Sequence, residues 1–184
     1  MPHISLNNDA PGIVGLMLYR PETGRLLNDL ADVLMRGENT LSRGERELIA
    51  TYVSRLNDCH FCGSIHGAVA AQQLPDGMPQ VVQACVNPHA ANVSPKMRAL
   101  LDIAALVRES GRAVTEEAVS AAREHGATDM EIHDTVLIAA MFSMFNRYVD
   151  GLGTLAPPDQ ADYEPMAKTI VADGYAGAVH RFAG

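Results

Sequence analysis

The stretch "LSRGERELIATYVSRLNDCHFCGSIHGAVAA", residues 41–71, predicts two consecutive helices with a pair of cysteines where they meet. Ser42 and Glu45 have the spacing of a capping box, in which a hydroxyl and a carboxylate satisfy unpaired amides of a first helical turn. Asn57 and Asp58 are good residues for capping the N-terminus of a helix, so they mark a break in the chain. We therefore expect a second helix to begin beside this pair and the chain to fold back on itself.

The rest of the chain also follows the helical period. Apolar side chains recur at helical spacing between capping residues and glycines in further segments. These segments are residues 23–37, 95–111, 115–126, 128–151 and 163–173. The first of them places five residues on one face: Leu26, Leu27, Leu30, Val33 and Leu34. Because strand-like alternation is absent, the predicted fold class is all-α.

A weak internal repeat suggests how the chain is organised. Residues 41–51 align with residues 93–103, and both segments carry Ser at the second place, Arg at the sixth and an apolar pair after it. On this alignment Cys59 and Cys62 fall opposite Gly111 and Val114, so only the first unit carries thiol chemistry. We predict a single domain, residues 1–184, made of a cysteine-containing unit, a second helical unit and a C-terminal helical tail. Their predicted bounds are 41–92, 93–156 and 157–184.

The amino-acid composition and the net charge exclude some classes of function. The 184 residues include 47% hydrophobic residues and carry a formal net charge of −8, with no cluster of basic residues. A nucleic-acid surface needs clustered Lys and Arg to neutralise phosphates, so no nucleic-acid partner is expected. The N-terminus lacks the pattern of a secretory signal, and the longest apolar run is too short to cross a bilayer. The sequence predicts a cytoplasmic protein with no membrane partner.

Three cysteines, two of them only three residues apart, do not make a disulfide scaffold. With roughly 100° of rotation per helical residue, Cys59, Cys62 and His66 point along one face of the second predicted helix. Such a set is a redox couple, part of a zinc site lacking a fourth ligand, or two small core residues. Cys59 would lie in the first helical turn, where the helix dipole favours the thiolate. Cys85 is interpreted as a packing residue.

Glu47 is the other candidate site residue, since it lies among apolar residues of a core-packing helix. On one straight helix it would be about 18 Å from Cys59, too far for the two to cooperate. The predicted break instead brings Glu47 toward the face that carries the cysteines and His66. The alternative is an exposed carboxylate paired with Arg43 or Arg46.

The spacing of these residues resembles that of a known family. Glu47 is followed after eleven residues by Cys59, after two more by Cys62, and after three more by His66. This pattern resembles the alkylhydroperoxidase AhpD family of the carboxymuconolactone decarboxylase-like superfamily, and in particular its branch of peroxidase-related proteins. The resemblance is strongest over residues 41–71.

The resemblance implies an all-helical homo-oligomer that reduces hydroperoxides. If the roles of the matching family residues apply here, Cys62 is oxidised to a sulfenic acid and Cys59 resolves it as a disulfide. Glu47 and His66 then form a proton relay. An external dithiol, in some relatives a lipoyl group on another protein, restores the thiols, and no cofactor is expected. The best-known members of the family carry a further relay histidine immediately before the second cysteine, and here that position is Phe61. His60 is one residue away and is expected to point elsewhere.

Two points stay open at the level of sequence. The helix dipole favours Cys59 as the more nucleophilic sulfur, whereas the family assigns peroxide attack to Cys62 and leaves Cys59 accessible to the reductant. The alternatives to a peroxidase are a lactone decarboxylase on the same fold, which needs no thiols, and a non-enzymatic redox-sensing or zinc-holding module.

Overall fold

In the computed structural model, which describes residues 1–182, the chain forms nine α-helices and two short 3₁₀ helices, with no strand among these residues. The α-helices are α1 (Gly12–Tyr19), α2 (Pro21–Arg36), α3 (Arg43–Leu56), α4 (His60–Ala71), α5 (Gly77–Val86), α6 (Pro95–Glu109), α7 (Glu116–Glu124), α8 (Asp129–Gly151) and α9 (Glu164–His180). The 3₁₀ helices are η1 (Gly111–Ala113) and η2 (Gln160–Tyr163). The predicted all-α fold class is confirmed.

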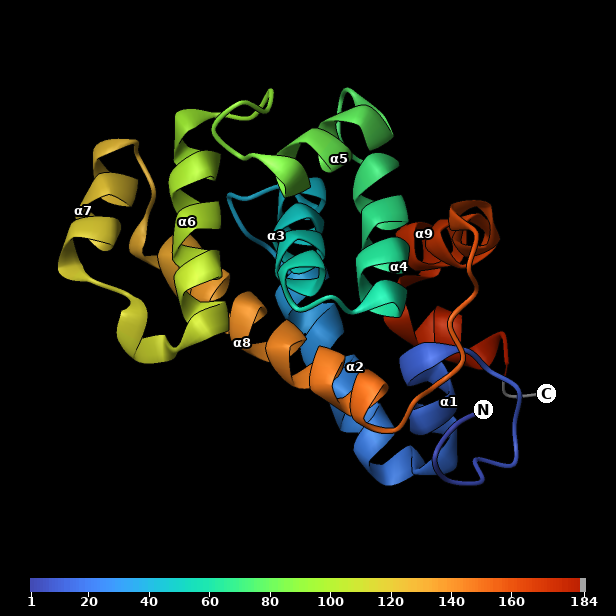
Figure 1. The fold of residues 1–184 in the computed structure, drawn as a ribbon. Helices are drawn as coiled ribbons and strands as arrows, with labels where there is room; N and C mark the ends of the chain where they lie inside the picture. The colour runs from blue at the N-terminus through green and yellow to red at the C-terminus, as the bar shows by residue number, and fades with distance from the viewer. Residues whose placement is uncertain (183–184) are drawn as a thin grey trace.

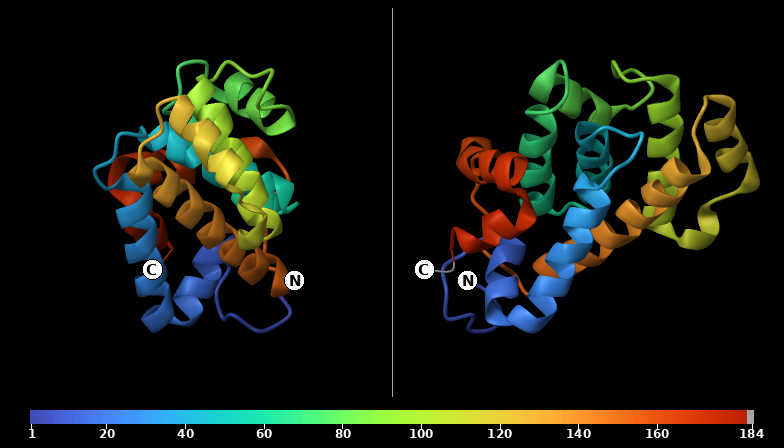
Figure 2. Two further views of the ribbon diagram at one scale, coloured as in Figure 1. Left: turned by 90° about the vertical axis from the view of Figure 1, so that its left-hand side faces the viewer. Right: turned by 180° about the vertical axis from the view of Figure 1, so that it is seen from behind.

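Helices α3 and α4 lie side by side in the middle of the molecule (Figure 1). Helices α6 and α7 flank them on the α3 side, α9 packs on the α4 side, and the long helix α8 contacts both α3 and α6. Helices α1 and α2 lie next to α9 and α8, and the views from the side and from behind show the same grouping (Figure 2). The C-terminal helix α9 therefore covers α4 on this side, and α1 and α2 pack in turn against α9 and α8.

The break between α3 and α4 has a clear local cause. The capping box of Ser42 and Glu45 is formed at the start of α3, as predicted. Helix α3 ends at Leu56, and Asp58 adopts a left-handed conformation with φ of 56°, which Asp tolerates better than most residues. The Cys59 amide then donates to the Ser54 carbonyl across this turn at 3.0 Å. The chain reverses here, so α4 runs back alongside α3.

Helix α2 presents its apolar residues on two sides. Leu34 and Met35 are buried together with Ala31 and the polar Asn28. Leu26 is 58% exposed and Val33 is 73% exposed, with the partly exposed Leu30 between them along the helix. The face expected from the sequence is therefore divided, and part of it faces solvent.

The C-terminal helix extends further than the sequence predicted. The expected helix ended at Asp173, before Gly174, whereas α9 continues to His180 across a kink at Gly174, where φ is 85° and ψ is −177°. A side chain at this position would begin 2.8 Å from Asp32 Oδ1, so glycine meets both the left-handed backbone and the close approach of α2. Just after the kink, Tyr175 lies beside His66 of α4, with ring centroids 5.8 Å apart.

No helix among residues 1–182 combines the length and the apolar character needed to cross a membrane. The predicted units 41–92, 93–156 and 157–184 stay a prediction, and the last two residues of the C-terminal unit lie outside the described part of the chain.

Candidate active site

Glu47 and His66 are hydrogen-bonded across the α3–α4 pair. Glu47 Oε2 lies 2.7 Å from His66 Nδ1, and the two residues are 2% and 8% exposed. A carboxylate on Nδ1 fixes the neutral imidazole as the tautomer with its proton on that nitrogen, which leaves Nε2 with a free lone pair. The alternative of an exposed Glu47 paired with an arginine is wrong, because the turn between the helices buries this carboxylate against His66.

Tyr175 completes this pair from the far end of the chain. Its hydroxyl donates to Glu47 Oε1 at 2.5 Å, and its backbone amide donates to Asp32 Oδ1 at 3.0 Å. Burial, with the negative charge of Glu47 as a further cause, holds the pKa of Tyr175 well above its usual range. Tyr175 thus remains a neutral donor, and both oxygens of the Glu47 carboxylate are occupied. Tyr175 was not predicted from the sequence, because Asp173 and Gly174 indicated the end of a helix.

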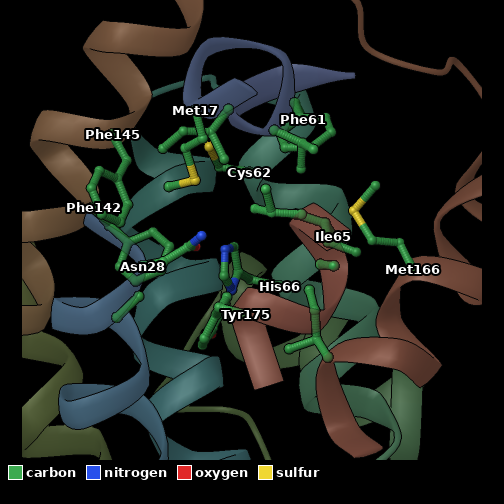
Figure 3. Close-up of a pocket in the computed structure, with 16 residues that line it drawn as sticks. Met17, Asn28, Phe61, Cys62, Ile65, His66, Phe142, Phe145, Met166 and Tyr175 are labelled. Carbon is green, nitrogen blue, oxygen red and sulfur yellow. The ribbon is translucent and has the colours of Figure 1, made fainter. Parts of the chain in front are cut away.

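Cys62 lies one turn before His66 on α4, and both line one small cavity (Figure 3). The cavity has a volume of about 40 Å³, which is room for roughly three water-sized molecules. Its walls are mostly apolar and include Met17, Phe61, Phe142 and Met166. The His66 ring also packs edge-on against Phe142, with ring centroids 4.4 Å apart. The cavity therefore presents one thiol and one imidazole in apolar surroundings.

The electrostatics at Cys62 favour the protonated thiol. A hydrogen bond to Cys59 is the largest cause that raises the pKa of Cys62 well above its usual range, and burial and the charge of Cys59 act in the same direction. A hydrogen bond from Asn146 partly opposes them. Cys62 therefore needs a base before it can attack an electrophile, and the His66 imidazole lies on the same cavity wall.

Cys59 is the N-cap residue of α4, where the sequence analysis expected the helix to begin, but it is not exposed. Cys59 is 1% exposed and Cys62 is 2% exposed, so the expectation of a sulfur accessible at the helix start is wrong. The neighbouring Asp58 and His60 take the exposed positions instead. Both cysteines are free thiols.

Asp150, near the end of α8, is a neighbour of Cys59 that the sequence analysis did not identify. Partial burial raises the pKa of the Asp150 carboxyl, and a hydrogen bond with the Cys59 thiol acts in the opposite direction. One turn earlier on α8, the Asn146 amide nitrogen donates to Ser54 Oγ at 3.0 Å and its oxygen accepts from Asn57 at 2.9 Å. These contacts fix α8 against the turn that carries the cysteines.

Of the two residues between the cysteines, His60 points away from the Glu47–His66 pair, whereas Phe61 lines the cavity. His60 Nε2 lies 2.9 Å from the Pro157 carbonyl oxygen, on the exposed side of α4. Phe61 is buried and packs against Gly12, where any side chain would overlap its ring, and against Tyr163 with ring centroids 5.8 Å apart. Position 61 is therefore part of the cavity wall, and no second histidine takes part beside Cys62.

Two observations concern the remaining candidate residues. Cys85 is partly buried against the core, and burial raises its pKa to about 11, which fits a packing residue. Among residues 1–182 there is no group of three or more His, Cys, Asp or Glu side chains arranged to hold a metal ion.

Comparison with known proteins agrees with this fold. The family model described as "Carboxymuconolactone decarboxylase family" matches residues 21–76, a segment that contains Glu47, both α4 cysteines and His66. The solved structure of an "alkylhydroperoxidase AhpD core: uncharacterized peroxidase-related protein" from Ralstonia eutropha JMP134 is similar, with 30% sequence identity and a TM-score of 0.76. The match covers 86% of this chain and 82% of that chain.

A second solved structure, of an uncharacterized peroxidase-related protein from Silicibacter sp. TM1040, has 28% identity and a TM-score of 0.75, and the match covers 84% of this chain and 78% of that chain. None of the curated proteins matches this chain. An all-helical protein with a CxxC pair beside a buried Glu–His pair is the class that the fold and the site define. This chain belongs to the AhpD-like proteins of the carboxymuconolactone decarboxylase superfamily.

Proposed function

We propose that this protein is a thiol-dependent peroxidase that reduces hydroperoxides through a Cys59–Cys62 dithiol–disulfide cycle. The observation that carries the proposal is the 2.7 Å contact between Glu47 Oε2 and His66 Nδ1 on the wall of the cavity that Cys62 lines. A thiol with a raised pKa, an imidazole with a free nitrogen and a buried carboxylate behind it form the arrangement that activates a nucleophile. The names of the two similar solved structures point to the same chemistry.

In the first step His66 Nε2 takes the proton of the Cys62 thiol, and Glu47 stabilises the resulting imidazolium. The thiolate attacks the terminal oxygen of the hydroperoxide, the O–O bond breaks, and its electron pair goes to the alkoxy oxygen. His66 then returns the proton to that oxygen, so an alcohol leaves and Cys62 becomes a sulfenic acid. The peroxide gains two electrons and the sulfur loses two.

In the second step Cys59 attacks the Cys62 sulfur. A disulfide forms, the hydroxyl of the sulfenic acid leaves as water, and the thiol proton of Cys59 is transferred to it. Asp150 is the carboxylate beside Cys59 and is suited to hold that proton during the transfer. Two sulfurs three residues apart at a helix start are a common arrangement for such a disulfide.

In the third step an external dithiol reduces the disulfide by thiol–disulfide exchange and returns the enzyme to its starting state. Since Cys59 is 1% exposed, the turn from Asp58 to His60 must move before a reductant reaches this sulfur. We propose a lipoyl group on a partner protein as one candidate dithiol, on the strength of the family resemblance.

The cavity limits the size and charge of the substrate. A volume of about 40 Å³ holds hydrogen peroxide without movement, and larger alkyl hydroperoxides require α1 or α9 to shift outward. The apolar walls disfavour a hydroperoxide with a charged group, because that group would lose its hydration water without gaining a polar partner in the cavity. We therefore propose small, uncharged hydroperoxides as substrates.

We further propose that the protein acts as a homo-oligomer. Leu26, Leu30 and Val33 form an apolar stripe on α2 that is open to solvent, and a second copy of the chain is the proposed cover. The stripe lies on the helix whose buried face borders the candidate active site. Assembly would therefore also hold α2 in place.

The test of the proposed function is a peptide map after one equivalent of hydrogen peroxide. We expect Cys59 linked to Cys62 and Cys85 left as a free thiol. The Cys85→Ser variant is the matched control and should lose thiols at the rate of the wild type, whereas Cys62→Ser should form no disulfide within the chain. A disulfide that includes Cys85, or no thiol loss with any hydroperoxide, would remove the basis for the proposal.

A further inference from the structure

Asn28 lies on the buried face of α2, and its side chain makes no contact that explains a polar residue at this position. It is 8% exposed and its side chain makes no hydrogen bond within residues 1–182, but it is not among the fully buried polar groups that lack a partner, so its amide stays open to the cavity and the groove that it lines. Buried amides are costly unless they are hydrogen-bonded, and most buried polar side chains in proteins have a partner. An unpaired amide at a core position is therefore a feature that folding alone does not favour.

The position of Asn28 indicates what its partner is. Asn28 lines the same cavity as Cys62 and His66, and its amide group points across that cavity toward the His66 ring (Figure 3). The other side chains that α1 and α2 contribute to this wall, such as Met17 and Ala31, are apolar. Asn28 thus provides the polar group on the wall opposite α4.

An open groove lies next to the cavity, on its outer side. Asn28, Met17 and Val179 border both the cavity and an open groove of about 470 Å³ between α1, α2 and the end of α9. The groove faces solvent and is lined further out by charged residues such as Arg25 and Asp29. A small molecule that enters from this groove passes the Asn28 amide before it reaches Cys62.

We propose that Asn28 binds the hydroperoxide substrate and orients it toward Cys62, an inference that rests on the proposed function. The amide nitrogen donates a hydrogen bond to the alkoxy oxygen, which becomes negative as the O–O bond breaks. The amide oxygen accepts the O–H of the terminal oxygen before attack. Asn28 is suited to both contacts because a carboxamide carries a donor and an acceptor side by side.

This role predicts a loss that is specific to peroxide. In Asn28→Ala, the rate of Cys62 oxidation by hydrogen peroxide and by ethyl hydroperoxide should fall about tenfold or more, as expected when a donor to a developing oxyanion is removed. The rate of Cys62 alkylation by iodoacetamide and its pH profile should stay as in the wild type, because the Glu47–His66 pair is intact. Met17→Ala is the matched control, since it widens the same cavity without removing a donor.

Met17→Ala should slow peroxide oxidation much less than Asn28→Ala, because it removes no hydrogen-bond donor from the cavity. Thermal unfolding of both variants shows that each is folded. Wild-type peroxide rates in Asn28→Ala, or an equal loss in Met17→Ala, would overturn the role of Asn28 and leave the proposed function standing. A wild-type protein that reacts with neither peroxide would overturn both.

Discussion

Tyr175 and Glu47 are 128 residues apart in the chain, yet the Tyr175 hydroxyl donates a 2.5 Å hydrogen bond to the buried Glu47 carboxylate. The other carboxylate oxygen is held by His66. Helix α9 therefore contributes directly to the candidate active site, although the motif that identifies the family lies entirely in α3 and α4. Under the proposed mechanism, the strength of the Glu47–His66 base depends on this contact between residues far apart in the chain.

The Tyr175→Phe variant tests that dependence. Fewer hydrogen bonds make a carboxylate more basic, so the Glu47–His66 pair should hold its proton to a higher pH. The pH at which peroxide oxidation of Cys62 is half-maximal should therefore move upward, as measured by thiol loss between pH 5 and 9. Tyr19→Phe removes a hydroxyl from a residue that is 50% exposed and should leave the profile unchanged. An identical profile in Tyr175→Phe would mean that Tyr175 only fills space.

Glu47→Gln should slow peroxide oxidation of Cys62 tens-fold or more, because a positioned general base contributes about 10²–10⁴-fold. His66→Ala should cost a similar amount, and the double variant should lose far less than the product of the two, since residues of one relay act as a unit. Stopped-flow measurement of thiol loss gives the three rates. Glu116→Gln, on the exposed face of α7, is the control. If the rate loss in the double variant equals the product of the two single losses, Glu47 and His66 do not act as one relay.

The raised pKa of Cys62 sets the sign of its pH dependence. Below that pKa the thiol is protonated, so the fraction of thiolate, and with it the rate, rises with pH. In His66→Ala, where the base is absent, the rate of peroxide oxidation should rise about tenfold per pH unit through the neutral range, because one proton must leave first. The wild-type profile should be flatter. A His66→Ala profile as flat as the wild type would show that the imidazole takes no proton from Cys62.

The motif residues and the all-α class could be predicted because both depend on local patterns: capping boxes, helical period and the spacing from Glu47 to His66. A break near Asp58 was also predicted, but the expected capping of α4 by Asn57 or Asp58 was wrong: Asn57 is the C-cap of α3, Asp58 takes the left-handed conformation, and Cys59 is the N-cap of α4. Tyr175, Asp150 and Asn28 could not be predicted in the same way, because each belongs to a helix whose own pattern carries no chemistry. Only the packing of α9, α8 and α2 on α4 gives them a role. The exposure of Cys59 was predicted wrongly, because its polar neighbours face solvent while the sulfur turns inward beside α8.

The kink in α9 should be sensitive to a single methyl group. In Gly174→Ala the side chain would begin 2.8 Å from Asp32 Oδ1 at a φ of 85°, so the free energy of unfolding should fall by about 1–2 kcal/mol or more. Denaturant unfolding measures the loss. At Gly151, where an added side chain meets nothing within 4 Å, the change to Ala should be neutral or stabilising. Equal effects at the two glycines would argue against strain at Gly174.

The apolar stripe on α2 gives a test of assembly. Val33 is 73% exposed, so Val33→Glu should leave the fold of the single chain intact while placing a charge in the proposed contact. Light scattering at micromolar concentration should show an oligomer for the wild type and a smaller species for Val33→Glu. Val86→Glu, at an 81% exposed position on α5, is the control. A monomeric wild type would contradict the proposed homo-oligomer.

The proposed mechanism depends most directly on which cysteine sulfur the peroxide oxidises first. In Cys59→Ser the sulfenic acid formed by one equivalent of hydrogen peroxide has no resolving thiol beside it and can be trapped and located by peptide mass. We predict a single sulfenic acid at Cys62 in Cys59→Ser, and none at Cys59 in Cys62→Ser. A sulfenic acid at Cys59 in the Cys62→Ser protein, formed as fast as that at Cys62, would contradict the assignment of Cys62, His66 and Glu47 as the reacting set.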